Sequence, residues 1–276
     1  MKISVTLSAH DNTEAVLDCI DALKKYVTND ILLVVDGASW ENWGKKNDFG
    51  VKKIEGFHHK YPKAPYRNMT YGLYNSKKIF PDADWYCYCE YDVLFTSSEF
   101  KKDLEKADKS GIWCLGNDLR KYNFKLPYFD RIVGKEIKDY FYLLGCCVFH
   151  NKKFMNKMID DNFFERFLQS TNTFEKGHFP NYEEQGGYDF GETVFPTMAH
   201  YYGGTVGQLA VWNQFLNQWN GSFQKYPMRW KPELGWEDNF KEACILHPLK
   251  NESELRIYHK IKRIRQERIQ NEQHGI

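Results

Sequence analysis

The acidic pair Glu90 and Asp92 is the feature of this sequence best suited to chemistry. The two carboxylates lie one residue apart and directly follow Trp85 to Cys89, a segment with the aromatic-rich composition of a central strand. Carboxylates at this spacing can hold Mg²⁺ or Mn²⁺ against a diphosphate. Such triplets also occur in solvated turns, but open α/β sheets bind ligands at the carboxyl ends of their strands. We therefore expect a cation site here.

The elements that must position this pair begin with two strand–helix units. Residues 2–7 alternate polar and apolar side chains, which predicts a half-buried strand. Apolar residues then recur at helical spacing after a cap at Asn12 or Thr13. The segment ILLVVDGAS is apolar at successive positions, which predicts a strand covered on both faces in a parallel sheet and ending at Asp36.

The middle of the chain continues the alternation of strands and helices. Residues 40–63 are polar and irregular apart from a short strand in VKKIEGF, and RNMTYGLYNSKKIF reads as a helix. After the acidic pair, SSEFKKDLEKADKSG predicts a helix, IWCLGND a strand, and YFYLLGCCVFHNKKFMNKMI a strand followed by a helix. Residues 172–250 are dense in Gly, Trp and Tyr, which indicates loops and short elements facing a substrate. The pattern predicts an α/β fold with a mostly parallel sheet.

Composition limits the classes of function. The 276 residues suit one compact unit, and a net charge of +1 provides no whole-molecule field for nucleic acid. Seven cysteines without a CxxC pair favour buried free thiols. Because the chain opens on a strand pattern and no apolar run reaches the roughly 20 residues of a membrane helix, we expect a cytoplasmic protein.

Four segments in order, KISVTLSAHDN, ILLVVDGAS, APYRNMTYGL and WYCYCEYDVLF, resemble the GT-A glycosyltransferases. The resemblance implies a Rossmann-like, mostly parallel central sheet flanked by helices. It covers residues 1–250, and most closely the first hundred. It implies that the following residues bind a nucleotide sugar: Ser8, Ala9, Asp11, Asp36, Arg67, Asn68, Glu90, Tyr91 and Asp92.

The same resemblance implies a metal centre with three ligands. Glu90 and Asp92 correspond to the acidic motif of the family, although Glu90 replaces its usual first Asp and leaves open whether that carboxylate binds directly or through water. His247 in ILHPLK resembles the C-terminal histidine that completes the site in many members, with a buried or capping histidine as the alternative. The expected cofactor is Mn²⁺ or Mg²⁺.

A second acidic motif resembles the one that supplies the acceptor-activating base in inverting members. Asp189 and Glu192 follow a Gly-Gly turn at the start of a predicted helix. Either one is a candidate base, and capping of that helix is the alternative reading, above all for Asp189. Neither need be a base if the enzyme retains configuration.

The regions beyond the motifs have less specific readings. We predict a catalytic domain over residues 1–250, divided into a nucleotide-sugar-binding half (1–110) and an acceptor-side half (111–250). Indole rings between residues 212 and 236 suit an acceptor platform or the core. Residues 251–276 form a predicted basic amphipathic helix, which either packs on the domain or makes peripheral contact with an anionic membrane.

The resemblance therefore implies a metal-dependent hexosyltransferase. It would move a hexose from a nucleotide diphosphate sugar, by resemblance a UDP sugar, to a hydroxyl of a glycan or glycolipid, as in polysaccharide biosynthesis. A sugar-phosphate nucleotidyltransferase is an alternative, but SAHDN lacks the glycine-rich phosphate loop that this chemistry needs. A non-catalytic glycan-binding or nucleotide-binding protein is a further alternative.

Overall fold

The computed structural model describes residues 1–10, 12–58, 64–122, 130, 133–171, 190–213, 218–221, 225–226, 243–247, 270 and 273. The side chains of 64–66, 190, 210–213 and 218–221 lie outside this description. So do Asp11, Asp189, most of the predicted C-terminal helix and the indole rings between residues 212 and 236. Among the described residues, no helix is long and apolar enough to cross a membrane.

The described elements follow the predicted alternation. In chain order they are β1 (Ile3–Ala9), α1 (Thr13–Tyr26), β2 (Ile31–Val35), α2 (Gly37–Ser39), the π-helix η1 (Trp40–Gly44), β3 (Lys52–Glu55), α3 (Ala64–Ile79), β4 (Trp85–Glu90), β5 (Leu94–Phe95), α4 (Phe100–Lys109), β6 (Ile112–Tyr122), β7 (Tyr140–Asn151), α6 (Lys152–Asp160), α7 (Phe163–Ser170), α8 (Phe190–Tyr201), β8 (Thr205–Gln208), β9 (Ala210–Asn213), β10 (Gln218–Gly221) and β11 (Ile245–Leu246).

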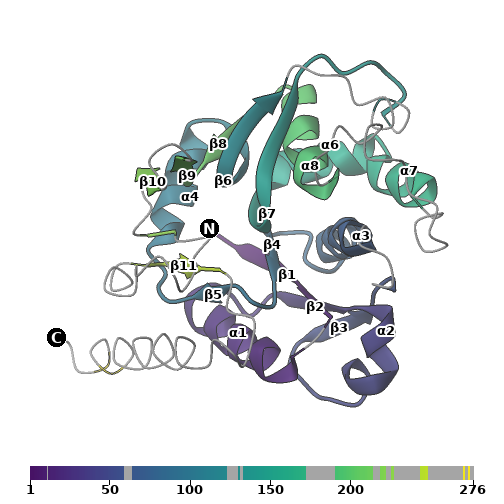
Figure 1. Cartoon of the computed structure of the whole chain (residues 1–276), viewed down its shortest axis with the longest axis vertical. Helices are drawn as coiled ribbons and strands as arrows, with labels where there is room; N and C mark the ends of the chain where they lie inside the picture. Colours follow the sequence, from purple (N-terminus) through teal and green to yellow (C-terminus); the bar gives the residue numbers. More distant parts are fainter. Residues whose placement is uncertain are drawn as a thin grey trace.

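One seven-stranded sheet organises the chain, with the order β3-β2-β1-β4-β7-β6-β8 (Figure 1). The strands β3, β2, β1 and β4 are parallel to one another, and β7 is antiparallel to both of its neighbours. The α/β class with a mostly parallel sheet is thereby confirmed. Because β1 and β4 are adjacent, the carboxyl end of β4 lies beside that of β1, and Ser8 is in register with Glu90.

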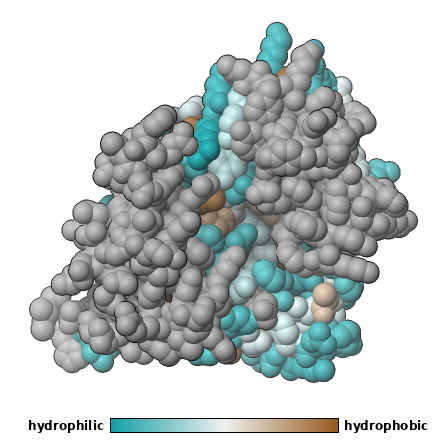
Figure 2. Space-filling model, in the orientation of Figure 1, coloured by the Kyte–Doolittle hydropathy of each residue, from teal (hydrophilic) through white to brown (hydrophobic). Residues whose placement is uncertain are grey.

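Each face of the sheet has its own apolar core. On one face, α1, α4, β5 and β11 pack against the central strands around residues such as Leu7, Cys87 and Phe149. On the other face, α3, α6, α7 and α8 enclose Tyr86, Tyr88 and a group of phenylalanines. Figure 1 shows these two sets of helices on opposite sides of the sheet. The described surface in Figure 2 is correspondingly mostly hydrophilic.

Local sequence explains where α1 begins. Asn12 has a left-handed backbone (φ 55°), and its side-chain oxygen accepts a hydrogen bond from the Ala15 N–H at 3.1 Å. This satisfies one of the free N–H groups at the helix start. The cap expected at Asn12 or Thr13 is therefore Asn12.

The segment after β2 differs from the irregular structure expected for residues 40–63. Asp36 caps the short helix α2, which continues as the π-helix η1. The Lys53 ammonium from β3 donates to the carbonyl oxygens of Gly44 at 2.8 Å and Asn47 at 2.6 Å, so that it closes the end of this helical segment. The local sequence pattern does not predict η1, because a contact that supports it comes from Lys53, which lies outside the helical segment.

All seven cysteines are free and buried, as their spacing indicated. Cys87 and Cys147 lie on neighbouring strands with their sulfur atoms 3.9 Å apart. Burial raises the pKa of the Cys114 thiol well above its ordinary value. These thiols belong to the packed interior of the sheet.

Candidate metal centre

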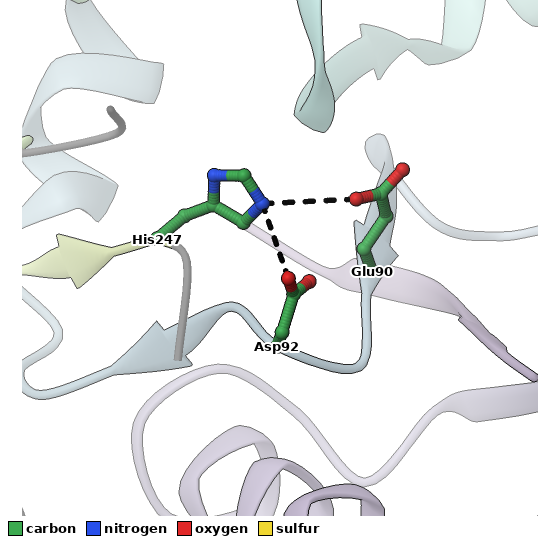
Figure 3. A group of neighbouring side chains, drawn as sticks. All are labelled: Glu90, Asp92 and His247. Atoms are coloured by element: carbon green, nitrogen blue, oxygen red, sulfur yellow. Dashed lines mark ion pairs between the residues drawn. The ribbon is translucent and has the colours of Figure 1, made fainter. Parts of the chain in front are cut away.

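Three side chains from two distant parts of the chain meet beyond the carboxyl end of β4. The Nε2 atom of His247 lies 3.4 Å from Oδ2 of Asp92 and 3.7 Å from Oε2 of Glu90. Figure 3 shows both carboxylates approaching the same ring nitrogen. The structure thus brings together the three residues that we predicted as metal ligands from the sequence.

The loop after β4 and the β5–β11 pair produce this arrangement. A turn closed by the Val93 N–H to the Glu90 carbonyl at 3.0 Å places Asp92 below the end of β4. The chain continues into β5, which pairs antiparallel with β11 through Leu94 and Leu246. His247 follows Leu246 directly and therefore reaches the turn that carries Asp92.

Further contacts hold β11 in place. The Thr96 N–H donates to the Cys244 carbonyl at 2.9 Å, and the Ser97 hydroxyl contacts the Cys244 sulfur at 3.2 Å. The Cys244 N–H donates to the Lys225 carbonyl at 2.7 Å. The backbone position of His247 is therefore fixed from both sides.

The donor set fits a divalent cation. Two carboxylates and an imidazole are ligands that Mn²⁺ and Zn²⁺ accept, and one ligand atom from each lies within 4.8 Å of the others. Ligands bound at about 2.0–2.3 Å to one ion lie roughly 3–4.6 Å apart, which brackets the observed separations. The Asp92 side chain is 0% exposed, and a carboxylate in such an environment is stabilised by a nearby positive charge. The residues present therefore fit a cation.

The electrostatics of His247 are consistent with an acidic surrounding. Burial of the ring opposes protonation, but Cys146 and Asp92 outweigh it and raise the pKa of His247 well above its ordinary value. Cys146 hydrogen-bonds His247 from β7, and burial raises the pKa of its thiol to about 11. The residues around Cys146 carry no signal for this contact, because only the register of β7 brings the thiol to His247.

The expected nucleotide-binding residues at the ends of β1 and β2 lie beside this centre. The Ser8 carbonyl accepts from the Tyr91 N–H at 3.0 Å, and the buried Ala9 accepts from the Asp36 N–H at 2.8 Å. The Tyr91 ring packs edge-on against His10, 5.1 Å between centroids. These residues thus join the ends of three adjacent strands.

Asp36, Arg67 and Asn68 make contacts within the protein. One Asp36 carboxylate oxygen accepts from the Ala38 N–H at 2.9 Å and caps α2. The Asn68 amide accepts from the Phe57 N–H at 2.5 Å and donates to the Phe57 carbonyl at 3.0 Å. The Arg67 guanidinium stacks on the Phe57 ring at 3.8 Å. Arg67 and Asn68 therefore hold the segment after β3 against α3.

Of the two candidate general bases, Asp189 and Glu192, only Glu192 is among the described residues, and it reaches the same end of the sheet. It lies in the first turn of α8, and its carboxylate accepts from the Gly145 N–H at 2.7 Å. Gly145 precedes Cys146, the neighbour of His247, so α8 brings a carboxylate to the β7 side of the centre. The helix predicted after Asp189 is confirmed, with Glu192 inside it.

Comparisons with known proteins add structural likeness alone. Neither the models of known protein families nor the curated protein sequences give a match. Among solved structures, a glycosyltransferase involved in glycosylating the major capsid of PBCV-1 is 10% identical over 95% of this chain and 100% of its own, with a TM-score of 0.48.

Two further solved structures carry different chemistries. Mouse xyloside xylosyltransferase 1 is 10% identical over 91% of this chain and 100% of its own, with a TM-score of 0.41. A cytidylyltransferase from Leptospira borgpetersenii is 12% identical over 75% of each chain, with a TM-score of 0.39. Likenesses this distant do not distinguish sugar transfer from nucleotide transfer.

Proposed function

We propose that this protein is a metal-dependent glycosyltransferase, which moves a hexose from a nucleotide diphosphate sugar to a hydroxyl of a glycan or glycolipid. The observation that supports this most directly is the convergence of Glu90, Asp92 and His247 on one point at the carboxyl end of β4. An acidic cluster alone would be weak support. Here the imidazole comes from a different segment, and one of the carboxylates is fully buried.

In this proposal the three side chains hold Mn²⁺ or Mg²⁺ against the diphosphate of the donor. A cation bound there supplies positive charge that stabilises the departing nucleoside diphosphate. Asp92 and His247 would bind it directly, and Glu90 directly or through water. Glu90 is the most exposed of the three, with 35% of its side chain accessible, which suits the side open to the phosphates.

The nucleoside would lie where β1 and β2 end, since open α/β sheets bind ligands at this edge. Ser8, Ala9 and Tyr91 would line the nucleoside site, Asp36 would lie at the end of β2, and uridine is the nucleoside that we propose. Arg67 and Asn68 would support the wall from α3, in keeping with their contacts to Phe57.

Removal of the acceptor proton requires a base on the side of the donor sugar away from the leaving group, if the reaction inverts configuration. We propose Glu192 for this role. Its carboxylate is oriented by the Gly145 N–H and lies at the β7 side of the centre. Asp189 lies outside the described residues and is the second candidate.

Calorimetric titration with UDP and with GDP, each with and without Mn²⁺, tests the proposal on the wild-type protein and on Asp92→Ala. Asp21→Ala is the control, because it removes a carboxylate from an exposed position of α1. We expect nucleotide diphosphate binding that needs both Mn²⁺ and Asp92 and is unchanged in the control. No binding of either nucleotide would contradict the proposal. Binding of a nucleoside triphosphate, with release of its pyrophosphate when a sugar phosphate is supplied, would identify a nucleotidyltransferase instead.

A further inference from the structure

Asn117 in β6 is fully buried, and neither its amide nitrogen nor its amide oxygen has a hydrogen-bond partner among the residues that the structure describes. The amide has two N–H donors and one acceptor oxygen. Nearly all buried polar side chains in proteins make hydrogen bonds, and an exception calls for a specific explanation, such as a ligand. Asn117 is therefore a candidate for contact with a bound molecule.

The backbone around Asn117 departs from a regular strand. The register between β6 and β7 shifts on both sides of its pairing with Leu144. The next residue, Asp118, has a left-handed backbone with φ 56°. Such irregularities in a ladder re-aim side chains and are frequent beside active sites. This distortion coincides with the residue whose amide is unpaired.

The charge of Asp118 is compensated locally. Its carboxylate accepts from Arg120 Nη2 at 2.8 Å and from Nε at 3.3 Å. Arg120 is thus engaged with the carboxylate, and the other nearby cation of β6, Lys121, pairs with Asp139 at 2.9 Å. The amide of Asn117 is neutral and suits a neutral, hydrogen-bonding group.

The order of strands β4, β7 and β6 in the sheet places Asn117 two strands away from the candidate metal centre. Its partner Leu144 adjoins Gly145, which holds Glu192, and β7 pairs with β4 through Cys147 and Cys89. Glu90 is level with Cys146, two residues along β7 from Leu144. With a rise of about 3.3 Å per residue and a strand spacing of about 4.8 Å, Asn117 lies on the order of 12 Å from Glu90.

We propose that Asn117 binds hydroxyl groups of the donor sugar and thereby contributes to the choice of sugar. This inference rests on the proposed function. A sugar attached to a diphosphate at Glu90 and Asp92 extends over the distance estimated above. Each sugar hydroxyl both donates and accepts, so one or two hydroxyls can satisfy the donors and the acceptor of a carboxamide.

The test compares Asn117→Leu, which keeps the approximate shape of the side chain, with the wild-type protein. Affinities for UDP and for a panel of UDP hexoses are measured by calorimetry with Mn²⁺, and thermal unfolding is followed without ligand. Asn156→Ala is the control, because Asn156 is an exposed asparagine on α6. Asn117→Ala is a second variant in case leucine prevents folding.

The two readouts should move independently. Removing an unpaired buried amide should leave thermal stability unchanged or raise it. The affinity for UDP should stay within about twofold of the wild-type value. The ratio of the affinity for a UDP hexose to that for UDP should fall about tenfold or more, as expected for one or more lost hydrogen bonds. The control should change neither quantity.

An Asn117→Leu protein, or its alanine equivalent, that keeps the full gain from the sugar would overturn the inference while leaving the proposed function intact. So would a wild-type protein that binds UDP with Mn²⁺ but gains nothing from any attached hexose. A marked loss of stability with unchanged sugar affinity would show that the amide has a structural role. A wild-type protein that binds no nucleotide at all would overturn both proposals.

Discussion

His247 and Asp92 are in contact, with 3.4 Å between Nε2 and Oδ2, although more than half of the chain separates them. The two residue pairs of β5 and β11 bring them together. A cation held by both side chains would link the early and late parts of the fold.

The first prediction concerns His247. Replacing it with Gln should weaken Mn²⁺ binding at least about 100-fold, because a direct ligand should contribute more than the outer groups, whose loss costs about 10–100-fold. Calorimetry or the electron paramagnetic resonance of free Mn²⁺ measures the affinity. His200→Gln is the matched control, since His200 is exposed on α8. Equal losses in both variants would contradict a ligand role for His247.

The same residue predicts a pH dependence. Its pKa is raised in the cation-free protein, so the ring stays protonated to a higher pH than an ordinary histidine. Binding a cation requires the neutral ring, and therefore releases a proton. The Mn²⁺ affinity should rise with pH, by about tenfold per unit below the pKa of His247. Titrations in buffers of different ionisation enthalpy measure the released proton, which should be absent from His247→Gln.

A third prediction tests Glu192 as the base. Glu192→Gln keeps an oxygen that can accept from the Gly145 N–H, so the fold and nucleotide binding should be preserved. The turnover rate should fall about 10²–10⁴-fold, because a general base contributes that much. Steady-state transfer assays separate kcat from the KM of the donor. If kcat is unchanged, proton removal belongs to another group.

Local sequence encodes some parts of this molecule, and tertiary contacts determine the others. Strands β1, β2 and β4 follow from apolar runs, the start of α1 follows from Asn12, and the acidic pair follows from its place after an apolar strand. The pairing of β5 with β11, only two residues long, has no local signature. The irregular register that pairs Asn117 with Leu144 of the next strand, β7, also has no signature in the residues around Asn117. Contacts between such segments arise from tertiary packing.

A fourth prediction concerns Asp18, a carboxylate next to Asp92 that is not one of the proposed ligands. Asp18 on α1 is buried, and it lines with Asp92 a void of about 10 Å³. Its negative charge should strengthen cation binding at Asp92, because opposite charges attract strongly where water is excluded. Asp18→Asn should therefore weaken Mn²⁺ binding about tenfold or more. Asp21→Asn removes the same charge from an exposed position on the same helix and should have little effect; similar losses in both would point to a general charge effect.

The fifth prediction is a loss of stability in acid caused by His150. Burial lowers its pKa to about 3, from an ordinary value of 6.5. Between these values the unfolded chain binds the proton and the folded protein does not, so stability falls as the pH falls from about 6.5 toward 3. The slope from this group approaches about 1.4 kcal/mol per pH unit. Urea unfolding at several pH values should show a shallower dependence in His150→Phe; an identical slope would contradict this account.

The burial of all seven thiols has a practical consequence for such measurements. A thiol reagent that cannot enter the interior of the sheet reacts only when the chain opens. Because the cysteines are spread over α1, β4, β6, β7 and the residue before β11, the order in which they are labelled would report which part of the protein opens first. The native sequence thus contains its own set of probes for partial unfolding, with no need to introduce a label.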